Sequence, residues 1–405
     1  MALIIQKFGG TSVGTLDRIR HVADIIAKTR AEGHDVIVVV SAMSGETDRL
    51  IQMANQLSNN PAPREYDALV STGECVSAAL LTIALREKNI EACSLTGKQA
   101  QIFTSDEHRR ARITHIADAT IRGLLAEKKI PVITGFQGVN AMGDVTTLER
   151  GGSDTTAVAI ASALKADECQ IFTDVAGVYT SDPRIITDAR LLDRITYTEM
   201  LALASLGAKV LHKQAVELAK KHHIPVRVLS SFEAGSGTLI SGHDAVKKPW
   251  VSGVAFDRQQ AKLSIMGIPK ENDGLKYLLD AMLHINFEID MTVENHSASK
   301  DACDFIFTVH LDDYQKAVNF SEDIAKNISA REVIVDDQIA KLSIVGLGMK
   351  SHAGVAAKIF QALGSENIPI YLITSTEAKI STIIDEKHLE TGARLLHSAF
   401  ELGSI

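Results

Sequence analysis

The chain has 405 residues, of which 45% are hydrophobic, so it is long and apolar enough for two or three domains, and global disorder is excluded. Its formal net charge of −8 argues against nucleic acid or an anionic membrane as a main partner, because both attract basic surfaces. Four scattered cysteines without a C-x-x-C pair, and no apolar run long enough for a signal peptide or a membrane span, predict a cytoplasmic protein without a disulfide framework or a zinc site.

About the first 230 residues alternate short apolar runs with longer amphipathic segments. The predicted strands are Leu3–Phe8, Val36–Val40, Ile130–Thr134, Cys169–Thr173 and Pro225–Leu229. The predicted helices are Asp17–Arg30, Glu65–Arg86 and Asp154–Lys165. Several of these strands are apolar throughout, which is typical of strands buried on both faces of a parallel sheet. The alternation predicts an α/β domain with a mostly parallel sheet sandwiched by helices.

The first motif is QKFGGTSVG, which places Lys7 at the end of the first strand and before the turn made by Gly9 and Gly10. Glycines let backbone N–H groups approach phosphate oxygens, and the N-terminus of the following helix favours anions. In a Walker A loop the lysine follows the glycines, whereas here it precedes them. We expect Lys7 to lie over the turn and to neutralise charge on a transferred phosphoryl group. A tight turn with a surface lysine is the plainer alternative.

Two more motifs lie at a strand end and at a helix start. VVVSAMSGETDRL ends a buried strand at Ser41 and continues into a polar loop that contains Thr47. STGECVSAALL puts Glu74 in the first turn of an apolar helix, where a carboxylate stabilises the helix dipole. The same glutamate is suited to binding the ammonium group of a substrate.

The motif RGGSDTTAVA combines two glycines with polar residues at the start of a helix. Ser153 or Asp154 would cap that helix in the simplest interpretation. The functional interpretation uses the same geometry, because Gly151 and Gly152 open the backbone and Arg150 can bind a carboxylate with two hydrogen bonds.

Two motifs in the second half of this domain are suited to an anionic ligand. TDVAGVYTSDPR places Thr173 and Asp174 at a strand end and Tyr179 and Arg184 in the following loop, where open α/β sheets bind ligands. Ordinary turn chemistry explains the same residues equally well. GAKVLHKQAVELA places Lys209 near a helix start, which is electrostatically unfavourable unless an anion lies nearby. A solvated lysine is the plainer alternative.

A change of composition and a repeat divide the rest of the chain. The Gly-, Ser- and Lys-rich stretch 233–249 predicts a domain boundary. AKLSIMGIP begins at Ala261, and AKLSIVGLG begins 79 residues later at Ala340, each followed by a glycine, an amphipathic helix and an apolar strand. The predicted organisation is a first domain at 1–240, a linker at 241–260 and two related modules at 261–335 and 336–405. Two copies suit a paired, self-packing regulatory unit rather than a solenoid.

Together and in this order, KFGGTSVG, VVSAMSGETD, STGE, GFQGV, RGGSDTTAVA, TDVAGVYTSDPR and GAKVLH resemble the aspartate kinases of the amino acid kinase family. The resemblance runs nearly from end to end, and the repeat resembles paired ACT modules of the α+β, ferredoxin-like type. No dehydrogenase sequence follows, so the resemblance is to the monofunctional form. It implies that ATP phosphorylates the β-carboxylate of L-aspartate to 4-phospho-L-aspartate, toward lysine, threonine and methionine. A carboxylate needs no general base, so catalysis would reduce to positioning and charge neutralisation, with Mg²⁺ held largely by ATP phosphates and water.

The resemblance also assigns roles to residues at matching positions. The implied catalytic residues are Lys7 and Asp154. The implied ATP-binding residues are Lys7, Phe8, Gly9, Gly10, Ser41, Thr173, Asp174, Tyr179, Arg184, Lys209 and Val210. The implied aspartate-binding residues are Thr47, Glu74, Arg150, Gly151, Gly152, Ser153 and Asp154, with Arg150 on a carboxylate and Glu74 on the α-ammonium group. Ala176, Glu149 and Cys75 depart from the family pattern beside these positions.

The modules depart further from the family pattern. The first has Gly274 without the usual preceding proline, and the second has Pro369 where the first keeps Asn286. The resemblance implies lysine and/or threonine as effectors and a homodimer that pairs through the modules. The implied effector residues are Asp273, Gly274, Asn286, Asp290, Ser351, His352, Gly354, Val355, Ile368, Pro369 and Thr374. A kinase of another amino-acid carboxylate, such as glutamate, and a non-catalytic amino-acid sensor stay open as alternatives.

Overall fold

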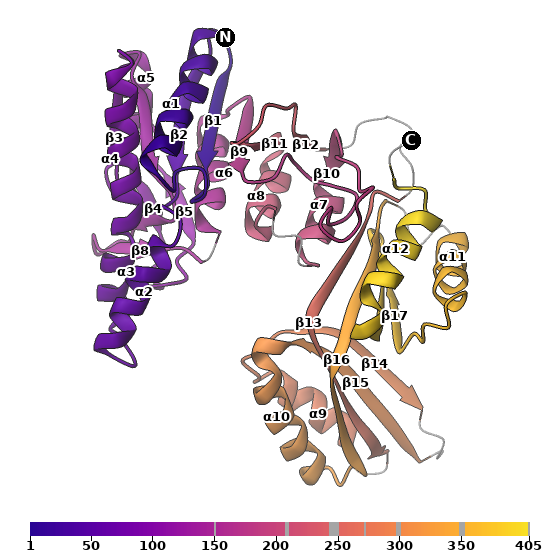
Figure 1. Ribbon diagram of the computed structural model, residues 1–405. Coiled ribbons are helices and arrows are strands. Elements are labelled where there is room, and N and C mark those ends of the chain that lie inside the picture. Colours follow the sequence, from indigo (N-terminus) through magenta and orange to yellow (C-terminus); the bar gives the residue numbers. More distant parts are fainter. Residues whose placement is uncertain are drawn as a thin grey trace. The chain divides into compact units, whose positions relative to one another are not determined.

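A computed structural model describes residues 1–149, 151–206, 210–242, 251–270, 273–296, 301–347 and 353–403 (Figure 1). The chain divides into two compact units. The N-terminal unit comprises residues 1–179 and 191–248, and the C-terminal unit comprises residues 180–190 and 249–405. The chain therefore passes from one unit to the other three times.

The N-terminal unit is built on an eight-stranded sheet in the order β10-β12-β11-β9-β1-β2-β6-β3. These strands are β1 (Leu3–Phe8), β2 (Asp35–Val40), β3 (Ala92–Leu95), β6 (Ile130–Thr134), β9 (Glu168–Thr173), β10 (Arg194–Thr196), β11 (Val226–Ser230) and β12 (Thr238–Ser241). All neighbours pair in parallel except β11 and β12, which are antiparallel. The predicted mostly parallel sheet is confirmed.

Helices cover both faces of this sheet, and the run Val36–Val40 of its central strand β2 is apolar throughout. Every residue from Val36 to Val40 is buried. Val36, Val38 and Val40 pack with α1 (Leu16–Ala31) and α4 (Thr72–Glu87) in one apolar cluster. The alternate residues of a strand point to the opposite face, where α6 (Gly152–Leu164) packs along β1, β2 and β9. The sandwich fixes where each strand ends, and thereby positions the site described below.

The predicted helix Glu65–Arg86 consists of two helices, α3 (Pro63–Val70) and α4, which meet at Ser71. Within the described part of the chain, Pro63–Glu87 is the one stretch long and apolar enough to cross a membrane, and 50% of its most apolar window is buried inside the protein. Such burial is typical of a core helix. Remaining helices of the unit are α2 (Glu46–Leu57), α5 (Ala119–Ala126), α7 (Tyr197–Ala204) and α8 (Lys213–His222).

A second, four-stranded sheet of the N-terminal unit has the order β5-β4-β7-β8. Its strands are β4 (Ile102–Thr104), β5 (Ile113–Ile116), β7 (Gln137–Val139) and β8 (Val145–Thr147). Three of these strands have only three residues, which is too short for a periodic apolar pattern to reveal them.

The C-terminal unit is a single six-stranded sheet in the order β14-β15-β13-β16-β18-β17. Its strands are β13 (Gly253–Pro269), β14 (Ile289–His296), β15 (Ala302–His310), β16 (Glu332–Val345), β17 (Leu372–Ser375) and β18 (Lys379–Asp385). The two copies of the repeat start on β13 and β16, which lie side by side and antiparallel at the centre of the sheet (Figure 1). Each copy adds two strands on its own side, as the predicted pair of related α+β modules requires.

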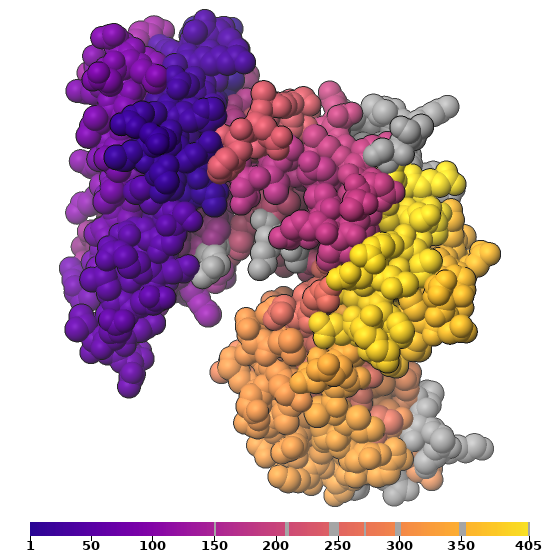
Figure 2. Space-filling model, in the orientation of Figure 1, coloured from indigo at the N-terminus to yellow at the C-terminus, as the bar shows by residue number. Residues whose placement is uncertain are grey.

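Helices α9 (Gly274–Met282), α10 (Tyr314–Asn327), α11 (Ala353–Gly364) and α12 (Leu389–Ala399) complete the modules. One apolar cluster joins β13 and β15 with α9 and α10, and another joins β16 and β18 with α11 and α12. Figure 2 shows α11 and α12, at the yellow end of the colour scale, packed side by side at the surface.

The division into units differs from the predicted boundaries in two places. Strand β13 begins at Gly253 and pairs with β16 from its first residue, so much of the predicted linker 241–260 is part of the C-terminal sheet. Residues 180–190, predicted within the first domain, belong to the C-terminal unit. Ile186 explains this second difference, because it is buried in the apolar cluster of the second module.

Candidate active site

The site residues of the N-terminal unit come together because parallel strands end at the same edge of the sheet. Phe8 pairs with Val40 and Phe172, Val40 pairs with Thr134, and Thr173 pairs with Ser230. The loops that follow β1, β2, β6 and β9 therefore start side by side. This carboxyl edge is where open α/β sheets bind ligands.

Lys7 and Asp154 form a buried ion pair at this edge. Nζ of Lys7 lies 2.6 Å from Oδ1 of Asp154, and each side chain is only 11% exposed. The distance is short, but Oδ1 meets no hydrogen-bond geometry, so the contact is one of charge rather than a directed hydrogen bond. Asp154 is the third residue of α6, so the sheet end and a helix start hold the two charges together.

The glycine turn after β1 leaves no room for a side chain at Gly10. A Cβ on Gly10 would lie 2.9 Å from the carbonyl oxygen of Ala42, and a Cβ on Gly9 would lie 3.5 Å from Nζ of Lys7. The Gly9 N–H donates to the carbonyl of Phe172, and the Ser44 N–H donates to that of Gly10. The turn is thus fixed against the loops after β2 and β9, with the lysine ammonium beside it as expected.

Glu74 lies under the loop that follows β2. Its Oε1 accepts a hydrogen bond from the Ala42 N–H at 3.1 Å, whereas its Oε2 is buried and has no hydrogen-bond partner among the described residues. The residue is 3% exposed, and this burial raises the pKa of Glu74 to about 7. A buried carboxylate oxygen without a donor is an open position for a cation. Thr47, on the first turn of α2, is half-buried, and that turn packs near the start of α4, because a Cβ on Gly73 would touch Ala42 and Glu46.

Gly151, which precedes α6, adopts a left-handed backbone conformation that favours glycine. Gly151 has φ = +81° and caps α6, and a Cβ there would lie 2.3 Å from the ring of His212. Ser153 is buried, and its Oγ lies against Gly135 at the end of β6, where a Cβ would come within 2.6 Å. The stretch is therefore held between β6 and the start of α8. Arg150 lies outside the described residues.

The residues predicted for ATP fall into three groups. Ser41, Thr173 and Asp174 follow β2 and β9 at the carboxyl edge, and the Thr173 hydroxyl donates to Asp174 at 3.1 Å. Tyr179 and Val210 are half-buried residues of the same unit. Lys209 lies outside the described residues. Arg184 belongs to the C-terminal unit, where its guanidinium binds the Asp182 carboxylate at 2.7–3.2 Å.

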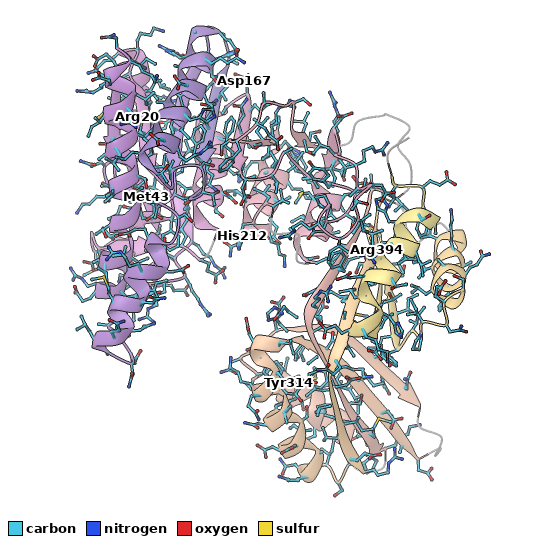
Figure 3. The ribbon with its side chains drawn as sticks, in the orientation of Figure 1. Arg20, Met43, Asp167, His212, Tyr314 and Arg394 are labelled. Carbon is cyan, nitrogen blue, oxygen red and sulfur yellow. The ribbon has the colours of Figure 1, made fainter. Side chains whose placement is uncertain are left out.

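Three polar residues at or near this edge were not predicted. Thr134, at the end of β6, is buried, and its hydroxyl has no hydrogen-bond partner in the part of the chain that the structure describes. His212, labelled in Figure 3, has its ring beside Gly151, and its buried Nδ1 has no hydrogen-bond partner among the residues described. Asp67 of α3 is fully buried and accepts hydrogen bonds from His108, the Arg109 N–H, and both the N–H and hydroxyl of Thr147. Thr134 adjoins the motif GFQGV and His212 lies within GAKVLH, so these two motifs could have pointed to both residues. No sequence motif indicates Asp67.

The residues predicted to bind effectors lie in the C-terminal unit, except that Ser351 and His352 are outside the described residues. Asp273 has φ = +48° before α9, and Gly274 is buried against Ile268 and Ile328. Asn286, Gly354 and Pro369 are exposed, Thr374 is half-buried in β17, and Val355 and Ile368 are core residues of the second module. Asp290 forms an ion pair with Lys341, which is 2% exposed.

Among the described residues, no group of three or more His, Cys, Asp or Glu side chains is arranged to hold a metal ion. The carboxylate beside Lys7, that of Asp154, is engaged with the ammonium group. The four cysteines are free thiols, and burial raises the pKa of Cys75 beside Glu74.

Residues 2–230 match the amino acid kinase family, and residues 342–400 match an ACT domain. The chain thus belongs to the amino acid kinase family. It is 54% identical to the aspartokinase of Pseudomonas aeruginosa, over 99% of this chain and 98% of that relative, and 44% identical to the aspartokinase of Geobacillus stearothermophilus over the same shares. These identities extend over the full length, and the enzyme is an aspartate kinase.

Solved structures agree with this assignment. Escherichia coli aspartokinase III in complex with aspartate and ADP is 25% identical, with a TM-score of 0.76 over 98% of this chain and 99% of that one. The aspartate kinase of Synechocystis is 40% identical, with a TM-score of 0.56 over 99% of this chain and 70% of that one. The amino acid kinase fold with C-terminal ACT modules is therefore confirmed.

Proposed function

We propose that the enzyme transfers the γ-phosphoryl group of ATP to the β-carboxylate of L-aspartate, giving 4-phospho-L-aspartate, as the first step toward lysine, threonine and methionine. The observation that carries this proposal is the Lys7–Asp154 ion pair beside the Gly9–Gly10 turn, at the carboxyl edge of the sheet. The reaction brings a carboxylate and a triphosphate together, and both are anions. A lysine ammonium held at that edge reduces their mutual repulsion.

Lys7 is the residue to which we assign charge neutralisation in the transition state. The Gly10 N–H would lie against the phosphates, because the Gly9 N–H already donates to the Phe172 carbonyl. Asp154 would hold the ammonium group in place between turnovers, since its carboxylate contacts Nζ at 2.6 Å. Asp154 would then be a positioning partner of Lys7 as well as a neighbour of the aspartate substrate.

Aspartate recognition is assigned to Glu74, Arg150, Thr47 and the stretch from Gly151 to Asp154. Oε2 of Glu74 supports the role of this residue as acceptor for the α-ammonium group, because binding would satisfy a buried oxygen to which none of the described residues donates. Arg150 would bind a carboxylate of the substrate with two hydrogen bonds. Thr47 and Ser153 would add hydroxyl contacts.

The nucleotide is assigned to Phe8, Ser41, Thr173, Asp174, Tyr179, Arg184, Lys209 and Val210, together with the glycine turn. Mg²⁺ would be bound mainly by the ATP phosphates and water, because Asp154 is already paired with Lys7. When bound, the ion neutralises phosphate charge. The protein residues orient the reacting groups, and a carboxylate nucleophile needs no protein base.

Regulation is assigned to the two ACT modules, with lysine and/or threonine as feedback inhibitors. Escherichia coli aspartokinase III, 25% identical to this chain, has been solved with lysine and aspartate bound. The Lys341–Asp290 pair bears on this assignment, because an effector that uses Asp290 for its ammonium group would compete with Lys341. We further propose a cytoplasmic homodimer that pairs through the ACT modules.

Hydroxamate formation with Mg-ATP and either aspartate or glutamate tests the proposal. Turnover with aspartate that exceeds turnover with glutamate by at least about 100-fold is expected, because a site built for one chain length misplaces the carboxylate of the other. Comparable rates would favour a broader amino-acid carboxylate kinase, and binding of lysine or threonine without turnover would favour a sensor. Assays with lysine, threonine, both and neither identify the inhibitor.

A further inference from the structure

The segment 180–190 interrupts the N-terminal unit and is part of the core of the C-terminal unit. Its Ile186 is 2% exposed and lies in one apolar cluster with Leu342 of β16 and Leu396 of α12. On either side of the segment the chain pairs with itself, because Tyr179 bridges Leu191 and the Leu192 N–H donates to the Val178 carbonyl. The segment is therefore a loop closed at its base, with its apolar residue anchored in the second ACT module.

A buried histidine of α12 holds the base of this loop. Nε2 of His397 lies 3.0 Å from the Thr180 hydroxyl, across 217 residues of sequence. The same hydroxyl accepts the Arg190 N–H at 2.9 Å, and the Thr180 N–H donates to the Arg190 carbonyl at 2.9 Å. The Thr180 carbonyl in turn accepts the Val254 N–H at 2.7 Å. Thr180 thus joins both ends of the loop to β13 and α12.

The protonation state of His397 is fixed by its surroundings. The residue is 1% exposed, and this burial lowers the pKa of His397, so the ring is neutral at physiological pH. The Asp188 carboxylate lies 3.7 Å from Nδ1 and favours a proton there, which leaves Nε2 as the acceptor of the Thr180 hydroxyl proton. The direction of both hydrogen bonds is therefore defined: the Arg190 N–H donates to the Thr180 hydroxyl, which donates to Nε2 of His397.

We propose that His397 of the second ACT module is a positioning residue for the nucleotide, which it affects by fixing Thr180 and hence the stretch from Tyr179 to Arg184. This inference rests on the proposed assignment of Tyr179 and Arg184 to ATP. Two further contacts support it. Arg394 of α12 (Figure 3) donates to the Ile185 carbonyl at 3.3 Å, and the Asp182 carboxylate orients the Arg184 guanidinium through its Nε and Nη2. Arg184 is thus held by contacts within the C-terminal unit.

The proposal predicts a split between the two substrates. Thr180→Val keeps the shape of the side chain but removes the hydroxyl, and His397→Leu removes the acceptor. Either change should raise the KM for Mg-ATP and the Kd for Mg-ADP about five- to tenfold, which corresponds to one lost buried hydrogen bond. The KM for aspartate should change less than about twofold, because Glu74 and the Gly151 stretch belong to the other unit. His397→Gln retains an acceptor and should restore most of the affinity.

The measurements are steady-state kinetics, calorimetric Mg-ADP titration and hydrogen exchange of peptides covering 180–190. His284→Gln, at an exposed histidine of the first module, is the matched control and should change nothing. Hydrogen exchange of the Arg190 amide, which donates to the Thr180 hydroxyl, should be faster in the Thr180 and His397 variants than in the parent. If those variants misfold, Asp188→Asn, at a side chain that is 63% exposed, tests the same contact and should raise the Kd for Mg-ADP about twofold.

Variants that exchange faster at Arg190 but bind Mg-ADP as tightly as the parent would show that His397 is only structural. Equal rises in the KM values of ATP and aspartate would also overturn the proposal, since they indicate general damage. A parent enzyme without turnover would refute the proposed function instead, and the exchange and Mg-ADP measurements would still decide the role of His397.

Discussion

Replacing Glu74 by glutamine should make the enzyme more stable at alkaline pH and poorer at binding aspartate. Burial raises the pKa of Glu74 from 4.5 to about 7, whereas the unfolded chain releases this proton near 4.5. Between these values the folded state holds a proton that the unfolded state has lost, so the free energy of unfolding falls as the pH rises through this window. Above pH 7 the charged Glu74 lowers the free energy of unfolding by its full amount, and below about pH 4.5 it does not lower it.

The size of the effect follows from the pKa difference. At about 1.4 kcal/mol per pKa unit, the buried charge costs about 3 kcal/mol at pH 8 and under about 1 kcal/mol at pH 5. The amide that Glu74→Gln introduces resembles the protonated carboxyl and keeps the acceptor for the Ala42 N–H. The unfolding temperature of the variant should therefore be about 6–12 °C above that of the parent at pH 8 and close to that of the parent at pH 5. Its KM for aspartate should rise about 30-fold or more, because an amide does not pair with the ammonium group.

Thermal unfolding at pH 5 and pH 8 and steady-state kinetics at pH 8 test this reasoning. Glu87→Gln, at the exposed end of the same helix, is the matched control and should change neither quantity. A Glu74→Gln variant that is less stable than the parent at pH 8, or a difference that does not depend on pH, would refute the burial argument. Unchanged aspartate affinity in a stabilised variant would refute the assignment of Glu74 to the substrate alone.

Three other changes test particular contacts. Lys7→Met should lower kcat by about 10²-fold or more with little change in the KM for aspartate, measured by hydroxamate formation, and an unchanged kcat would remove Lys7 from the chemistry. Gly151→Ala should abolish most activity, because φ is +81° and the added Cβ meets the His212 ring, whereas Gly235→Ala, with nothing within 4 Å, should be silent in the same assay. Asp290→Asn should lower the free energy of unfolding, measured in urea, by about 3 kcal/mol, because it leaves the buried Lys341 ammonium group without its partner. Lys341→Met removes the buried charge and should lower that free energy far less. Equal losses in the two variants would contradict the ion-pair argument.

The sequence predicts the strands of the central sheet well because several of them are continuous apolar runs. Strands β1 and β6 have the predicted bounds, and β2, β9 and β11 differ by one residue at one or both ends. Strands β1, β2 and β6 are buried on both faces along nearly their whole length, so hydrophobicity locates them, whereas β9 and β11 are partly exposed at alternate or terminal positions. Strands of three residues carry no such pattern, and the break at Ser71 is invisible because α3 and α4 are both apolar around it.

The motifs predict which residues gather at the carboxyl edge but not how the charges are satisfied. Lys7 and Asp154 stand 147 residues apart, and their 2.6 Å contact depends on α6 packing on β1. The orphaned Oε2 of Glu74 and the five hydrogen bonds to the Asp67 carboxylate depend on loops whose paths no local pattern specifies. The membership of residues 180–190 in the C-terminal unit was equally hidden, since Ile185-Ile186 resembles any short apolar pair.

The placement of Ile186 also has a consequence for the order in which the protein can fold. During synthesis from the N-terminus, this side chain emerges well before β16 and α12, the elements whose Leu342 and Leu396 cover it. The loop 180–190 therefore keeps an uncovered apolar side chain until α12 has been made. Chains that stop short of α12 would leave this loop open to proteases and to chaperones that bind apolar segments.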